Sequence, residues 1–210
     1  NALDAEASAK IYAAKGRPSD NPLIVHIADW EAIRAIVSEI PEAAKQLADA
    51  FWPGPLTMIL NKSDLVPYAT TGGLETVAVR MPGNPIARAL IRAGGGYVAA
   101  PSANTSGRPS PTKAEHVAED LNGKIDMIID GGTVDIGLES TIVDLTDGAP
   151  TILRPGYINQ EMLTKVLGEV EMDRGLIAPE SGVHPKAPGM KYRHYAPKAD
   201  LIIVQGEAEK

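Results

Sequence analysis

The stretch Tyr97-Val-Ala-Ala-Pro-Ser-Ala-Asn-Thr-Ser-Gly-Arg-Pro-Ser-Pro-Thr112 joins a short apolar run to a polar loop. The run 97–100 follows three glycines and predicts a buried strand. Ser102 and Asn104 are two residues apart, so an extended backbone would project both side chains to the same side. Three prolines stiffen the loop. A rigid polar loop after a buried strand is typical of a ligand site in an α/β protein, and the alternative is a surface turn that begins a helix at Thr112.

Hydrophobic patterning on either side of this stretch alternates between the helical and the extended period. The strands that it predicts are residues 23–27, 56–60, 76–80, 127–130, 141–145 and 151–154. The predicted helices are residues 4–14, 30–40, 42–51, 85–93, 113–121 and 161–167. Strands alternating with helices indicate an α/β domain with a mixed sheet.

Capping side chains precede three of these helices. Asp29 stands before helix 30–40, and Asn159 stands before the last predicted helix. Thr112 is followed three residues later by Glu115, which is a capping-box pattern. We expect each capping side chain to accept a hydrogen bond from a free backbone N–H of its helix.

Composition excludes several classes of protein. The chain has 210 residues, of which 44% are hydrophobic and 22% charged, so a packed globular protein is expected. The formal net charge of −7 disfavours a broad nucleic-acid-binding face but leaves a local basic cleft open. The sequence contains no cysteine, which excludes disulfides and thiolate zinc sites and fits a cytoplasmic location. No apolar run approaches the roughly 20 residues of a membrane span, so we predict no membrane association.

Four arginines occupy stiff positions next to prolines. Three of them directly precede a proline, and the fourth stands two residues before one; they are Arg17, Arg108, Arg154 and Arg80. A residue before proline is pushed into the extended region, which limits the directions its side chain can take. Arginine offers a planar fork of donors that suits phosphate and carboxylate groups. We therefore interpret the four as anion receptors, although surface arginines before prolines are also common.

The segment around Arg17 adds further polar groups. Lys15 and Arg17 are two residues apart, and Asn21 lies four residues beyond Arg17, an arrangement suited to a polyphosphate. No Walker A loop and no Gly-x-Gly-x-x-Gly fingerprint occurs in the sequence, which disfavours the common nucleotide-binding folds. His26, at the end of a predicted strand near this turn, is the histidine that we place in a site.

Other catalytic chemistries find little support. No Gly-x-Ser-x-Gly elbow occurs, and no histidine pairs with an obvious serine. No cage of histidines and carboxylates is visible, so we predict no protein-held metal, and Mg²⁺ would arrive with phosphate groups. The Gly-rich link before residue 141 delivers Glu139 and Ser140 to the start of a strand, where Ser140 either binds a small polar ligand or is simply a strand-edge serine.

Six motifs in order resemble those of the YrdC/Sua5 family of threonylcarbamoyl-AMP synthases, over about residues 1–170. They are Lys15-x-Arg17 with Ser19-Asp-Asn-Pro22, Trp52-Pro-Gly-Pro-Leu-Thr57, Val79-Arg-Met-Pro82, Pro101-Ser-Ala-Asn104, Glu139-Ser-Thr141 and Arg154-Pro-Gly156. The resemblance implies a twisted mixed sheet flanked by helices, with a central cleft.

The resemblance also implies a domain organisation. Residues 1–173 would form the YrdC-like catalytic domain, residues 174–199 an interdomain linker, and residues 200–210 the start of a Sua5-type C-terminal domain. The chain begins without the family's N-terminal strand and its Pro-Thr-Glu-Thr-type motif, so we expect it to be cut from a longer protein at both ends.

The implied reaction converts L-threonine, bicarbonate or CO₂, and ATP with Mg²⁺ into threonylcarbamoyl-AMP and pyrophosphate. The product would serve the machinery that adds the N6-threonylcarbamoyl group to adenosine 37 of tRNA. No tightly bound cofactor and no covalent nucleophile is needed, because the task is positioning and charge stabilisation.

The resemblance assigns roles to residues. The catalytic tetrad around the phosphates would be Lys15, Arg17, Ser102 and Asn104. Further ATP contacts would be Asn21, Thr76, Ser110, Arg154 and the linker residue Tyr195, with Tyr192 as the second candidate for that position. Threonine would be held by His26, Arg80 and Ser140, with Arg80 as the fork for its carboxylate.

Two alternatives stay open. One is a carbamoyltransferase domain of the hydrogenase-maturation kind, which forms a carbamoyl-adenylate from carbamoyl phosphate; the lack of cysteine and the Sua5-like linker count against it. The other is a non-catalytic RNA-binding module, whose local arginine cluster would bind RNA weakly and in a salt-sensitive manner.

Overall fold

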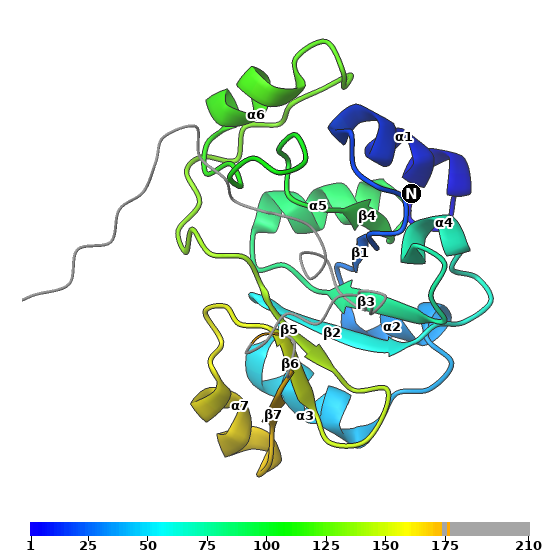
Figure 1. Cartoon of the computed structure of the whole chain (residues 1–210), viewed down its shortest axis with the longest axis vertical. Helices are drawn as coiled ribbons and strands as arrows, with labels where there is room; N and C mark the ends of the chain where they lie inside the picture. The colour runs from blue at the N-terminus through cyan, green and yellow to red at the C-terminus, as the bar shows by residue number, and fades with distance from the viewer. Residues whose placement is uncertain (174–175, 177–210) are drawn as a thin grey trace, which may run out of the picture.

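The computed structural model describes residues 1–173 and residue 176, and these form one seven-stranded mixed sheet (Figure 1). The strands are β1 (Ile24–His26), β2 (Leu56–Asn61), β3 (Thr76–Arg80), β4 (Val98–Ala100), β5 (Thr141–Asp144), β6 (Thr151–Arg154) and β7 (Glu171–Met172). Their order is β4-β1-β3-β2-β5-β6-β7, and the pairs β1–β3, β2–β5 and β6–β7 are parallel. The predicted α/β fold with a mixed sheet is confirmed.

Helices flank this sheet. They are α1 (Ala5–Lys15), the 3-10 helix η1 (Trp30–Ala32), α2 (Ile33–Ile36), α3 (Glu42–Phe51), α4 (Tyr68–Thr71), α5 (Pro85–Ala93), α6 (Ala114–Leu121) and α7 (Gln160–Leu167). In Figure 1, α1, α5 and α6 lie toward the top of the view, and α3 and α7, which contact each other, lie toward the bottom. None of the helices in the described part of the chain is long and apolar enough to cross a membrane.

The two faces of the sheet differ in what they bury. Alternate strand residues such as Val25, Met58 and Val79 join a large core with Ile33 and Leu47 from α2 and α3. A fully buried aliphatic side chain of this kind contributes about 1.5–3 kcal/mol.

Strand residues of the opposite parity form a small second cluster: Ile24, Ile59, Ala78, Ile142 and Leu153. His26 and Arg80 lie two residues beyond Ile24 and Ala78, so they emerge on this thinly covered face, where the candidate site forms.

The predicted strand 127–130 is wrong. Residues 122–140, which the structure describes throughout, contain no helix or strand, and Met127 is 74% exposed. The run Met-Ile-Ile-Asp has the composition of a strand, but the backbone of this segment is not paired with any sheet edge. An apolar run without a partner strand therefore remains a loop.

Two of the three predicted caps are also wrong. The backbone N–H of Thr112 donates to His116 Nδ1, and α6 begins after Lys113 without a side-chain cap.

The predicted helix 30–40 ends at Ile36, because Val37 is extended and bridges to Lys62.

Asp29 does stand at the start of η1, but its carboxylate makes no cap there. It pairs with Arg92 of α5 at 2.6 Å instead. The cap at Asn159 is confirmed, because its Oδ1 accepts from the N–H of Met162 at 2.9 Å.

Candidate functional site

A cavity of about 1160 Å³ lies over the thinly covered face of the sheet. Its floor is made by strand ends, and its roof is made by residues 100–140, which run in Figure 1 from α6 at the top down the left side to β5. Seven of the predicted site residues line this cavity: Arg17, His26, Arg80, Ser102, Ser110, Ser140 and Arg154.

His26 and Arg80 lie side by side at the ends of β1 and β3, because the parallel register pairs these two residues. Arg80 Nε donates to the carbonyl oxygen of Gly54 at 3.1 Å, which fixes the guanidinium plane. Burial lowers the pKa of Arg80, and the positive charge of Arg154 acts in the same direction. Arg80 and Arg154 line the same cavity, and the mutual repulsion of their charges favours an anionic ligand there.

His26 is neutral at physiological pH. Burial lowers the pKa of its imidazole to about 4, and the nearby charge of Arg80 adds to this effect. Nδ1 lies 3.2 Å from the carbonyl oxygen of Ile24. A neutral ring held in this way can serve as a hydrogen-bonding group for a ligand rather than as a second cation.

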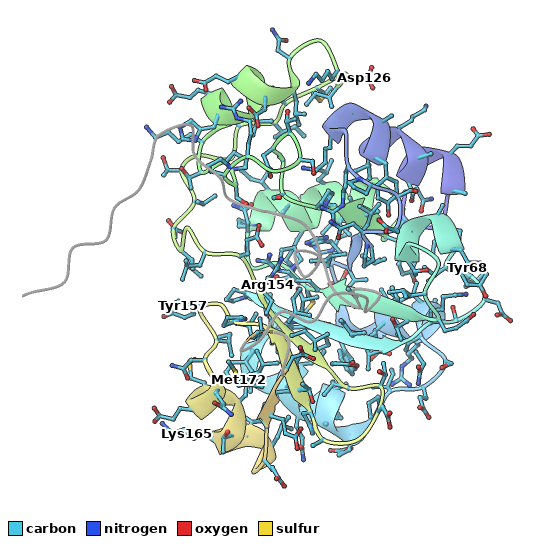
Figure 2. All side chains as sticks on the ribbon, viewed as in Figure 1. Tyr68, Asp126, Arg154, Tyr157, Lys165 and Met172 are labelled. Atoms are coloured by element: carbon cyan, nitrogen blue, oxygen red, sulfur yellow. The ribbon has the colours of Figure 1, made fainter. Side chains whose placement is uncertain are left out.

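Arg154, labelled near the middle of the view in Figure 2, is the last residue of β6. Its Nε and Nη2 both donate to the carbonyl oxygen of Ser140, at 3.1 and 3.0 Å. Its Nη1 lies 2.6 Å from the carboxylate of Glu139, which also accepts from Ser110 Oγ at 2.8 Å. Sequence reasoning missed this role of Glu139, because its partners come from distant segments.

Ser140 has a partner that the sequence did not indicate. Its hydroxyl lies 2.8 Å from that of Thr57, and both residues are buried. Thr57 is on β2, and it pairs with Arg80 across the β2–β3 ladder. Nη2 of Arg154 also donates to Ser140 Oγ at 3.1 Å, so the Ser140 hydroxyl is held at the cavity wall between Thr57 and Arg154.

Arg17 reaches the cavity from the turn after α1. Gly16 ends that helix with φ of 60°, a left-handed conformation that glycine adopts without strain. Arg17 Nη2 then donates to Asn21 Oδ1 at 2.7 Å, and its Nε donates to the carbonyl oxygen of the same residue at 3.2 Å. Asn21 is buried and is not among the cavity-lining residues, so in this structure it holds Arg17 in place.

Lys15, the last residue of α1, contacts the roof loop from its buried side. Its side chain is buried, and its ammonium donates to the carbonyl oxygens of Ser102 and Asn104. Burial lowers the pKa of Lys15 to about 8, with a further contribution from the charge of Arg17. The lysine thereby anchors the polar loop to α1.

Ser102 and Asn104 do not face the same way, contrary to the prediction. Ser102 lines the cavity, but Asn104 is buried inside the loop and its Nδ2 donates to the carbonyl oxygens of Thr105 and Arg108. The reason is that the backbone bends at residues 103–104 instead of staying extended. Asn104 Oδ1 is buried and has no hydrogen-bond partner within the described part of the chain.

Arg108, which we expected to be an anion receptor, forms an ion pair with Asp120 of α6. The other carboxylate oxygen of Asp120 accepts from the backbone N–H of Thr105 at 2.9 Å. Asp120 is therefore a clamp for the roof loop. Sequence reasoning missed it, although a carboxylate on the buried side of an amphipathic helix is an unusual feature that could have drawn attention.

One predicted ATP contact, Thr76, lies away from the cavity. Thr76 is at the opposite end of β3 from Arg80 and does not line the cavity. Tyr195 and its alternative Tyr192 lie outside the described residues. Among the residues that the structure describes, no group of three or more histidines and carboxylates is arranged to hold a metal ion.

Comparison with known proteins identifies the family. Residues 1–156 match the profile of the Sua5/YciO/YrdC family, described as "Telomere recombination", and residues 158–210 match that of the threonylcarbamoyl-AMP synthase C-terminal domain. The chain belongs to the Sua5/YciO/YrdC family.

Two curated relatives are named threonylcarbamoyl-AMP synthase. The Pyrococcus abyssi protein is 55% identical over 210 residues, which are 100% of this chain and 62% of the relative. The Bacillus subtilis protein is 54% identical over 211 residues, which are 100% of this chain and 60% of the relative. The chain thus spans about three fifths of the length of these relatives.

The crystal structure of P. abyssi Sua5 complexed with L-threonine superposes on this chain with a TM-score of 0.95. The two are 55% identical, and the match covers 99% of this chain and 61% of that one. The two family profiles meet between residues 156 and 158, before α7 and β7. In the structure β7 pairs with β6 and α7 packs on α3, so the described sheet continues past that point.

Proposed function

We propose that this chain carries L-threonylcarbamoyl-AMP synthase activity, which uses L-threonine, bicarbonate or CO₂, and ATP. The observation that carries the proposal is the gathering of three arginines, one neutral histidine and three serine hydroxyls around one cavity. The kinship with proteins that bear this name supports it.

The chemistry suits such a cavity. The threonine amine would be carboxylated to a carbamate, whose oxygen would attack the α-phosphorus of ATP and release pyrophosphate. Negative charge grows on the phosphoryl oxygens and on the leaving group, so fixed cationic donors stabilise the transition state. Holding the reacting groups together removes much of the entropic barrier, and no protein nucleophile is required.

We assign the phosphates to the roof of the cavity and to Arg154 at the adjoining edge of the floor. Arg17, Ser102, Ser110 and Arg154 would contact ATP directly. Lys15, Asn21 and Asn104 would support them from behind, since Lys15 holds the roof loop and Asn21 holds Arg17. A role for Thr76 or Tyr195 in ATP binding stays a prediction. Mg²⁺ would enter with the triphosphate, bound to its oxygens.

We assign threonine to the floor side. Arg80 would take the carboxylate, because its guanidinium is half-buried, donates to Gly54 and lies near the charge of Arg154. His26, neutral at pH 7, would hydrogen-bond the substrate without repelling its amine. The Ser140 hydroxyl, which contacts Thr57 and Arg154, would complete the pocket.

We propose that the product is passed, in the cytoplasm, to the machinery that modifies adenosine 37 of tRNA. Direct RNA binding is not required for the reaction, and the net charge of −7 keeps any RNA contact local.

Incorporation of labelled bicarbonate into an adenylate tests the proposal. We expect a labelled product only when ATP and L-threonine are both present. A product formed from carbamoyl phosphate instead would indicate the carbamoyltransferase alternative. No adenylate under either condition, together with salt-sensitive RNA binding that ignores ATP and threonine, would favour the RNA-binding module.

A further inference from the structure

Glu139 joins the two walls of the cavity. Its Oε2 lies 2.6 Å from Arg154 Nη1 on the floor, and its Oε1 accepts from Ser110 Oγ on the roof at 2.8 Å. The Glu139 side chain is 22% exposed and that of Arg154 is 16% exposed, so this ion pair is largely shielded from water. The carboxylate thus occupies two donors that the proposed function gives to ATP.

The backbone holds Glu139 in this position. A Cβ at Gly156 would lie only 2.5 Å from the carbonyl oxygen of Glu139, so the glycine permits a close approach of the two backbones. On the other side, the N–H of Thr141 donates to the carbonyl oxygen of Pro55, and its hydroxyl donates to that of Ile158. The side chain therefore starts from a fixed point beside Arg154.

Glu139 is also part of the charge balance of the cavity. Burial and Arg17 lower the pKa of Lys15, whereas the carboxylates of Asp120 and Glu139 act in the opposite direction. Asp120 is committed to Arg108 and the roof loop, but Glu139 faces the cavity itself. In the absence of a ligand, the carboxylate of Glu139 partly neutralises the positive charge of Arg154 in the cavity.

We propose that Glu139 is an internal counter-anion whose carboxylate a phosphate oxygen of the ligand replaces at Arg154 and Ser110. This inference rests on the proposed function, because it takes both donors to be phosphate contacts. In the empty site Glu139 keeps them pointed at the place that the phosphate will take. During binding it competes with the phosphate, and during release it helps pyrophosphate to leave.

Competition with phosphate and a purely structural role of Glu139 predict opposite changes in pyrophosphate affinity. If Glu139 competes with phosphate, Glu139→Gln should tighten pyrophosphate binding about fivefold, because the competing state and its negative charge are removed. If Glu139 served only to position Arg154, the same change would weaken binding. Release of pyrophosphate should slow in the variant, so kcat should fall while KM for ATP falls with it.

Calorimetric titration with inorganic pyrophosphate, with and without Mg²⁺, tests this. The wild type, Glu139→Gln, Arg154→Ala and the double variant form a cycle, in which we expect the gain from Glu139→Gln to vanish once Arg154 is removed. Glu161→Gln is the matched control, because it removes one carboxylate from an exposed pair with Lys165 on α7.

Weaker or unchanged pyrophosphate binding in Glu139→Gln would overturn the inference alone. A loss of affinity seen only with Mg²⁺ would also overturn it, by assigning Glu139 to the metal–phosphate complex. A wild type that binds neither pyrophosphate nor ATP would overturn the proposed function as well. Should Glu139→Gln not fold, Glu139→Asp keeps the charge on a shorter arm, and its pyrophosphate affinity should rise by a smaller factor; a fall would contradict the proposal.

Discussion

The floor and the roof of the cavity are held by different means. Arg80 and Arg154 end strands of the sheet, so the ladder hydrogen bonds and the core beneath them fix where the side chains start. The roof, residues 100–140, has α6 as its one helix beyond the end of β4, and its polar loop is held by Lys15 and Asp120. The floor is thus positioned by regular structure, and the roof by single buried charged side chains.

This difference predicts where substitutions act. Changes on the floor should remove ligand contacts and leave stability nearly unaffected. Changes to the residues that hold the roof should alter both the order of the loop and the binding of phosphate.

Lys15→Met should have the largest effect. It removes the donor shared by the carbonyl oxygens of Ser102 and Asn104, and a charged hydrogen bond of this kind contributes about 1.5–3 kcal/mol. We expect ATP affinity to fall roughly 100-fold by calorimetry, a change of about 2.7 kcal/mol. Lys10→Met, an exposed lysine on the same helix, is the control. A folded Lys15→Met protein with wild-type ATP affinity would contradict the anchoring role.

The pH dependence of ATP binding should follow Lys15. Its pKa is lowered to about 8, so the lysine loses its charge as the pH rises through that value. ATP affinity should therefore decline above pH 8, by at most about tenfold per pH unit. Lys15→Arg should remove the decline, because arginine stays charged over this range. The same decline in both proteins would show that another group titrates.

Asp120→Asn should loosen the roof. The amide can still accept from the N–H of Thr105, but it cannot pair with the charge of Arg108. We expect the free energy of unfolding to fall by roughly 1–2 kcal/mol, and the Thr105 amide to exchange its hydrogen faster. Glu119→Gln, an exposed neighbour on α6, should leave both unchanged. Unaltered exchange at Thr105 in Asp120→Asn would argue against a clamp.

Thr57→Val should have the smallest effect. It keeps the shape of a buried side chain but removes the hydroxyl that lies against that of Ser140. Loss of one neutral hydrogen bond, about 1 kcal/mol, should weaken threonine binding roughly fivefold and leave ATP binding unchanged. Thr151→Val, whose hydroxyl bonds to Ala149 away from the cavity, is the control. An equal loss for ATP would place Ser140 on the phosphate side.

The floor could largely be predicted from the sequence. The strand at 76–80 agrees with β3 in both bounds, because alternating β-branched residues give a clear period, and Arg80 follows directly from its end. Arg154 stands at the end of the predicted strand 151–154, and this too agrees with β6. Because Arg80 and Arg154 end their strands, predicting the two strands also predicts where these side chains lie in the site.

The roof could not be predicted in the same way. Its organisation depends on pairs that are distant in the chain: Glu139 and Ser110 are 29 residues apart, and Lys15 and Asn104 are 89 residues apart. Hydrophobic periodicity is a local pattern, so one sequence does not show which distant residues are in contact. The apolar run 127–130 has the composition of a strand but no partner, which is information that only the folded chain contains.

Cross-titration of two arginine variants shows whether the cavity binds phosphate at one side and threonine at the other. Each of Arg17→Ala and Arg80→Ala is titrated with ATP and with L-threonine. We predict that Arg17→Ala weakens ATP binding at least tenfold with little change for threonine, and that Arg80→Ala does the reverse, as expected for the loss of a charged contact. Equal losses of both ligands in both variants would contradict the division of the cavity.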